Sequence, residues 1–123
     1  MTIRPKKNGI GLARLRNAAL CSLNGLLFIW KNEEAFRQEM LLFLIGAPLA
    51  VFLGDNGCER ALLVGSLLLI LLMEVVNSAI ECVVDRISSE EHALSGAAKD
   101  LGSTAVALAL CGAGITWILV LWH

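Results

Sequence analysis

Three apolar runs, separated by short polar segments, organise most of the chain. Only the last of them reaches the ~20 residues that a helix needs to cross the hydrocarbon layer. The segments AFRQE (35–39) and VVNSAIECVV (75–84) can extend the other two runs, polar members included. The pattern predicts an all-α membrane protein in which one domain, residues 1–123, contains three spans. The apolar runs are 40–54, 61–73 and 101–122, within expected helices 33–54, 60–86 and 89–122.

The N-terminal third has a different pattern. Residues 1–9 are polar, basic and interrupted by Pro5 and Gly9, which predicts a flexible tail. Over residues 10–31 apolar side chains recur at helical spacing, while polar residues occupy much of the rest of the turn. This is typical of an amphipathic helix on a membrane surface. A soluble helix facing a core is the other interpretation, but the adjoining sequence leaves little soluble protein to pack against.

Local signals suggest where the helices begin and meet. Asn32 can cap the second helix, with Glu33 in its first turn, and DNGCER (55–60) is expected to form a short outer turn. The S-x-x-E spacing of Ser88 and Glu91 predicts a capping box that starts the last helix near residue 89, with Gly96 as a possible interruption. Small residues in the last span favour close helix approach: Gly102, Ser103, Ala105, Ala107, Ala109, Gly112 and Gly114.

Composition and charge strengthen the membrane interpretation and add an orientation. Hydrophobic residues make up 57% of the 123 residues and charged ones 17%, outside the ranges usual for soluble proteins. Seven of the ten Lys and Arg residues precede the first apolar run, Arg86 and Lys99 lie between the second and third, and Arg60 alone lies between the first and second. The positive-inside rule then places the N-terminus and the second loop in the cytoplasm. No signal peptide is expected, and the four scattered cysteines do not suggest a disulfide or metal framework.

Four polar residues follow or interrupt the most apolar stretch. Glu74, Asn77, Glu81 and Asp85 are spaced three, four and four apart, so they share one face of a helix. A carboxylate at the centre of a bilayer costs about 3 kcal/mol, so such groups usually face the protein interior or a water-filled site and mark function. A hydrogen-bond network that only packs the helices together is the alternative.

Two carboxylates at the cytoplasmic side could hold a cation. Glu33 begins the second helix on the same side as Glu81, and Mg²⁺ commonly takes one or two carboxylates with waters and phosphate oxygens. Glu33 could equally be an acid that complements a helix N-terminus. The second loop adds groups that could bind a nucleotide or merely be solvated, since no standard nucleotide motif occurs. They are Glu90, Glu91, His92, Lys99 and Asp100.

Three segments of the chain carry a resemblance to a known family: NEEAFRQE (32–39), EVVNSAIECVVDRI (74–87) and EEHALSGAAKDLGSTAV (90–106). They resemble the prokaryotic-type diacylglycerol kinases, small integral membrane enzymes. The resemblance implies phosphorylation of diacylglycerol to phosphatidic acid with ATP and Mg²⁺. It also implies a homotrimer in the bacterial cytoplasmic (inner) membrane, with active sites between subunits and an N-terminus in the cytoplasm. No nucleic-acid partner is expected.

The resemblance also implies residue roles. Glu74 matches the general base, Asn77 a residue that supports it, and Glu33 and Glu81 the metal ligands. Family members often have an aromatic residue in place of Cys21, Lys in place of Asn24 and a basic residue in place of Ala97, so nucleotide affinity is expected to differ. The implied nucleotide contacts are Arg14, Cys21, Glu33, Glu81, Glu90, Glu91, His92, Lys99 and Asp100. The implied lipid contacts are Arg14, Ala35, Phe36, Arg37, Gln38, Glu39, Ser103 and Trp117.

Three other functions compete with a diacylglycerol kinase. A polyprenol kinase such as undecaprenol kinase would use the same acidic residues, since lipid choice depends on groove shape. A small proton-coupled transporter could use Glu74, but this leaves Glu33, Glu81 and the charged loop without a role. A purely structural subunit would consume no ATP.

Overall fold

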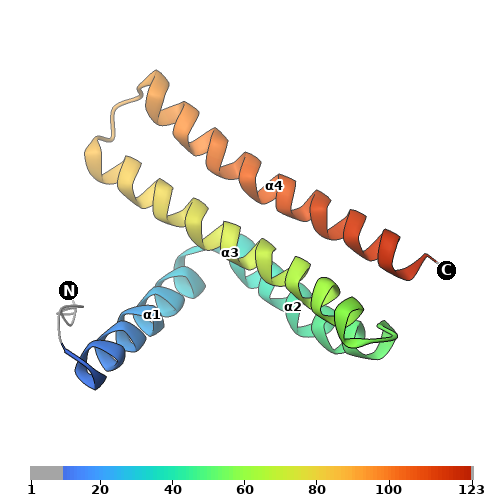
Figure 1. The fold of residues 1–123 in the computed structure, drawn as a ribbon. Helices are drawn as coiled ribbons and strands as arrows, with labels where there is room; N and C mark the ends of the chain where they lie inside the picture. The colour runs from blue at the N-terminus through green and yellow to red at the C-terminus, as the bar shows by residue number, and fades with distance from the viewer. Residues whose placement is uncertain (1–9, 123) are drawn as a thin grey trace. The chain divides into compact units, whose positions relative to one another are not determined.

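The computed structural model describes residues 10–122, which form four helices and no strand. This confirms the all-α class, and α2, α3 and α4 are each long and apolar enough to cross a membrane (Figure 1). The expected tail at 1–9 lies outside the described residues. The chain divides after Glu34 into two compact units, which are described separately. The helices are α1 (Leu12–Asn32), α2 (Glu34–Leu53), α3 (Gly57–Ile87) and α4 (Ala93–Leu121).

The first unit contains α1, which has the amphipathic character that the sequence predicts. Gly11 starts the helix at a positive φ of 63°, which glycine adopts without strain. Large apolar side chains such as Leu15, Leu23 and Leu27 are exposed along it, as expected for a helix on a lipid surface. The prediction that Asn32 caps α2 is wrong. Its Nδ2 donates to the carbonyl oxygen of Phe28 at 2.8 Å, so Asn32 ends α1.

A short connection joins α2 to α3 in the second unit. The Asn56 side chain accepts from the Glu59 amide at 2.9 Å and caps α3, which begins at Gly57 and not at 60 as expected. Arg60 Nε donates to the carbonyl oxygen of Val51 at 3.1 Å and satisfies one acceptor at the end of α2. The composition of DNGCER is typical of a turn, but Asn56 caps a helix there. The segment is therefore mostly helical.

The loop between α3 and α4 is longer than predicted. α3 ends at Ile87, and α4 begins at Ala93 with His92 Nδ1 accepting from the Leu94 amide at 3.0 Å. Ser88 Oγ instead accepts from the Glu90 amide at 3.0 Å, a local turn that competes with a helical start. The predicted capping box and the helix start at 89 are wrong. Gly96 does not interrupt α4.

The core of the second unit lies where α3 and α4 run antiparallel side by side (Figure 1). Small residues on α4 face large apolar residues on α3, which lets the two helices approach closely. Near the C-terminal end of α4, Trp117 Nε1 donates to Ser66 Oγ at 3.2 Å and to the carbonyl oxygen of Leu63 at 3.3 Å. Gly46 of α2 packs against Leu67 of α3. The buried cluster is Leu67, Ile70, Ala109 and Ala113.

Candidate functional site

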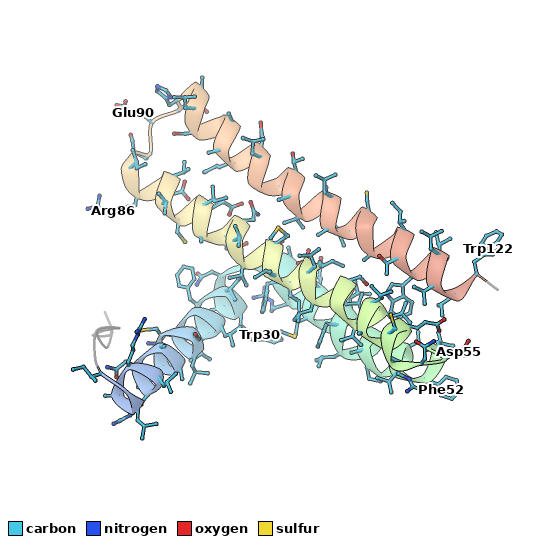
Figure 2. All side chains as sticks on the ribbon, in the orientation of Figure 1. Trp30, Phe52, Asp55, Arg86, Glu90 and Trp122 are labelled. Carbon is cyan, nitrogen blue, oxygen red and sulfur yellow. The ribbon has the colours of Figure 1, made fainter. Side chains whose placement is uncertain are left out.

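The polar face of α3 lies in its cytoplasmic half, as judged from the predicted orientation. A helix of 31 residues is about 46 Å long, whereas the hydrocarbon layer is ~30 Å thick, so α3 is longer than one crossing requires. Figure 2 shows Arg86 and Glu90 at this end of the α3–α4 pair and Asp55 and Trp122 at the other. Three polar side chains near the middle of α3 are buried: Glu74, 4% exposed, Asn77, 8%, and Ser78, 5%.

Two carboxyl groups meet beside this face. Glu39 of α2 and Glu74 of α3 lie within hydrogen-bonding distance of one another. An ionised carboxyl group only accepts hydrogen bonds, so the pair can share one only if one member carries a proton. Glu39 Oε2 is buried and makes no hydrogen bond among the described residues. A hydrogen bond between Glu39 and Glu74 therefore requires a proton on one of the two carboxyl groups.

One helical turn further along α3, an amide organises the next acid. Asn77 Nδ2 donates to Glu81 Oε1 at 3.3 Å, which fixes one carboxylate oxygen of Glu81. Glu81 is partly exposed, so its other oxygen remains accessible. Asn77 Oδ1 is buried without a hydrogen-bond partner in the described part of the chain. Glu74, Asn77 and Glu81 thus form a continuous polar row, with about 10 Å of helix rise between the two acids.

An open pocket of about 500 Å³ lies between the end of α3 and the start of α4. Lys99 Nζ and Asp85 Oδ1 form an ion pair of 2.7 Å at its wall, and the charge of Glu81 also acts on Lys99. The pocket combines acidic, imidazole and ammonium groups around a cavity of the size that small ligands occupy. It is lined by Val84, Asp85, Ser88, Ser89, Glu90, Glu91, His92, Ala93, Ser95, Gly96 and Lys99.

The structure brings together only part of the predicted site. Four of the expected nucleotide contacts, Glu90, Glu91, His92 and Lys99, line the pocket, whereas Asp100 is exposed outside it. Arg14, Cys21 and Glu33 belong to the first unit, where Arg14 is exposed and the other two are partly exposed.

The expected lipid contacts are dispersed within the second unit. In the segment 35–39 Phe36 is buried, Ala35 and Gln38 are exposed, and Arg37 and Glu39 are intermediate. Ser103 and Trp117 are fourteen residues apart on α4, about 21 Å of helix rise, so they do not meet in one chain. The indole N–H of Trp117 points to α3.

Sequence reasoning missed two features of this region. The residue spacing places Asp85 in the acidic row but indicates no partner for it. An acid before a loop and a lysine after it are a reasonable signal for an ion pair such as Asp85–Lys99. The Glu39–Glu74 contact had no signal in the spacing, because it depends on how α2 packs against α3. Among the described residues no group of three His, Cys, Asp or Glu side chains could hold a metal by itself. Mg²⁺ needs fewer protein ligands when phosphates complete its shell, so the carboxylates present are compatible with it.

Comparison with known proteins identifies the family. The model of the family described as prokaryotic diacylglycerol kinase matches residues 20–121. Diacylglycerol kinase of Escherichia coli strain K12 is 48% identical over 115 residues, which cover 94% of each chain. The enzyme of the same name from Haemophilus influenzae is 50% identical over 107 residues, covering 87% of this chain and 91% of the relative, and that of Pseudomonas aeruginosa is 45% identical over 121 residues and 98% of each. The chain belongs to the prokaryotic diacylglycerol kinase family.

Proposed function

We propose that the protein transfers the γ-phosphoryl group of ATP to the free hydroxyl of diacylglycerol and so forms phosphatidic acid at the cytoplasmic membrane face. The observation that carries this proposal is the polar row Glu74–Asn77–Glu81, which leads along α3 toward the pocket. A diacylglycerol hydroxyl lies at the headgroup boundary, close to the depth in the membrane that we propose for this polar row. The family membership supports the same reaction.

Glu74 is the proposed general base. As the lipid oxygen attacks the γ-phosphorus, its O–H bond breaks, the proton passes to the Glu74 carboxylate, and the bond from phosphorus to the ADP oxygen breaks. Burial of Glu74 keeps water from competing for that proton. Glu39 lies close enough to exchange a hydrogen bond with the base and, with Ala35, Phe36, Arg37 and Gln38, lies in the segment proposed to contact the lipid.

Glu33 and Glu81 are the proposed protein ligands of Mg²⁺. The ion would neutralise charge on the phosphates when bound. Asn77 fixes one oxygen of Glu81 and leaves the other accessible, which supports this role. We expect Glu81→Gln to raise the Mg²⁺ concentration needed for half-maximal turnover, since a neutral amide binds a hard cation weakly. The outer-turn variant Glu59→Gln is the matched control, and an equal requirement in both would contradict the assignment.

The pocket between α3 and α4 is the proposed nucleotide site. Lys99 would attract phosphate oxygens, and Glu90, Glu91 and His92 would orient the nucleotide. Asp100 of α4 and, in the first unit, Arg14 and Cys21 are further proposed nucleotide contacts. Ser103 and Trp117 are the proposed lipid contacts on α4. Because they lie far apart in one chain, the proposal includes a homotrimer in which subunits share active sites, with the N-terminus in the cytoplasm of a bacterial cell.

The lipid substrate can be tested directly. The purified protein is incubated in mixed micelles with ATP, Mg²⁺ and either diacylglycerol or undecaprenol, and phosphate transfer to each lipid is measured. We expect a higher kcat/KM with diacylglycerol. Faster turnover of undecaprenol would replace the proposed substrate with a polyprenol, and ATP consumption with neither lipid would contradict the kinase proposal.

A further inference from the structure

A glycine on α4 lies directly against the buried amide of the site. Gly102 is buried, and a Cβ atom added to it would overlap Asn77 Oδ1 and lie 3.3 Å from Asn77 Cγ. The Asn77 Cα would be 3.6 Å away, an ordinary contact. The obstruction is therefore with the side chain of Asn77 and not with the backbone of α3. Every residue type other than glycine has a Cβ atom, which at position 102 would displace the Asn77 amide.

The Asn77 side chain has little freedom to move away from this contact. It is 8% exposed, and its Nδ2 is committed to Glu81 Oε1 at 3.3 Å. Rotating the amide away from α4 would break that hydrogen bond, because the oxygen and the nitrogen belong to one rigid group. Asn77 Oδ1, enclosed against Gly102, has no hydrogen-bond partner among the described residues that would hold it elsewhere.

Other contacts join α3 and α4 on both sides of the Gly102–Asn77 contact. Three residues before Gly102, Lys99 pairs with Asp85 of α3 at 2.7 Å. Seven residues after it, Ala109 is buried in the cluster with Leu67 and Ile70. Because α4 is joined to α3 on either side, a methyl group at position 102 would displace the amide more easily than it would separate the helices.

We propose that Gly102 is a positioning residue of the phosphotransfer site, whose missing side chain keeps the Asn77 amide in the orientation that ties it to Glu81. The inference rests on the proposed function, since Glu74 and Glu81 flank that amide. Gly102 touches neither substrate in this scheme and acts only through Asn77.

The test combines Gly102→Ala with Asn77→Ala. Gly102→Ala alone is expected to lower kcat between about 10- and 100-fold, the effect of a displacement of about 1 Å in a site. Asn77→Ala removes the obstructed amide, so adding Gly102→Ala to it should change kcat by no more than about twofold. The matched control is Gly112→Ala on the same helix, where an added Cβ meets nothing within 4 Å and kcat should be retained. Losses that multiply in the double variant, or full activity of Gly102→Ala, would overturn the inference.

An NMR measurement tests the Gly102–Asn77 contact without depending on turnover. The side-chain amide resonances of Asn77, assigned by their absence from Asn77→Ala, should shift in ¹⁵N-asparagine spectra of Gly102→Ala and not of Gly112→Ala. Unchanged resonances would overturn the inference even if activity fell. If Gly102→Ala fails to fold, recovery of folding in the double variant supports the contact, and failure of both variants overturns it. A wild-type protein that phosphorylates no lipid would contradict the proposed function, while the resonances still decide the geometry.

Discussion

At the scale of single residues, burial distinguishes the two acids that touch. Glu74 is 4% exposed at one end of the row, whereas Glu39 is intermediate and approaches it from α2. Both could in principle accept a proton from a lipid hydroxyl. The position of Asn77 one turn from Glu74, and its bond to Glu81, connect Glu74 and not Glu39 to the proposed metal ligand.

Two amide substitutions separate their roles. We expect Glu74→Gln to lower phosphate transfer by at least about 100-fold, the upper contribution of a general base being near 10⁴. Binding of ATP and Mg²⁺ should persist, because neither contacts Glu74 in the proposed site. Glu39→Gln preserves shape and keeps a hydrogen-bonding group beside the base, so it should retain more activity than Glu74→Gln. Turnover in mixed micelles and equilibrium nucleotide binding are the measurements, and the opposite order of activities would assign the base to Glu39.

At the scale of elements, one side chain of α4 makes two hydrogen bonds to α3. Trp117 Nε1 donates to both Ser66 Oγ and the carbonyl oxygen of Leu63. A partly buried indole in a bilayer has few other partners for its N–H group. The contact therefore helps to hold α4 against α3 at this end of the pair.

Replacing this indole should lower stability, because its hydrogen bonds to α3 are lost. We expect Trp117→Phe to lower the free energy of unfolding by about 1 kcal/mol, the typical worth of one lost hydrogen bond. Trp122→Phe is the control, since Trp122 is 80% exposed just beyond α4. Denaturant titration in detergent micelles compares the two. Equal stabilities of both variants would show that the hydrogen bonds of Trp117 contribute little.

The sequence predicts which segments are helical better than it predicts where each helix begins and ends. The apolar runs and the amphipathic spacing of 10–31 specify four helices because period and length dominate there. Asn56 and Ser88 were misjudged because both are residues that cap helices or form turns, and only their hydrogen bonds decide between these states. Contacts between elements, such as Gly102 with Asn77, depend on packing that the spacing of one helix does not specify.

At the scale of the whole molecule, the distribution of Lys and Arg predicts the orientation in the membrane. The start of α3, which contains Cys58, should face outward, and the loop that contains Ser89 should face the cytoplasm. Cys58 is exposed, and Ser89 is exposed in the pocket wall. These two positions therefore offer probes for opposite sides of the bilayer.

A membrane-impermeant maleimide can test this orientation. In intact spheroplasts, a variant that retains only Cys58 should be labelled. A cysteine-free variant with Ser89→Cys should be labelled only after permeabilisation. The reverse pattern would move the acidic row to the outer face, where no cytoplasmic ATP reaches it, and would contradict the proposed function.

The short connection between α2 and α3 has a consequence for biogenesis. Only residues 54–56 separate the two helices, so they can enter the bilayer together as a hairpin during synthesis. Entering alone, α3 would have to carry Glu74 and Asn77 into lipid at a cost of several kcal/mol. In a hairpin, Glu39 of α2 arrives beside those groups. The short connection thus lowers the cost of carrying the buried polar side chains of α3 into the bilayer.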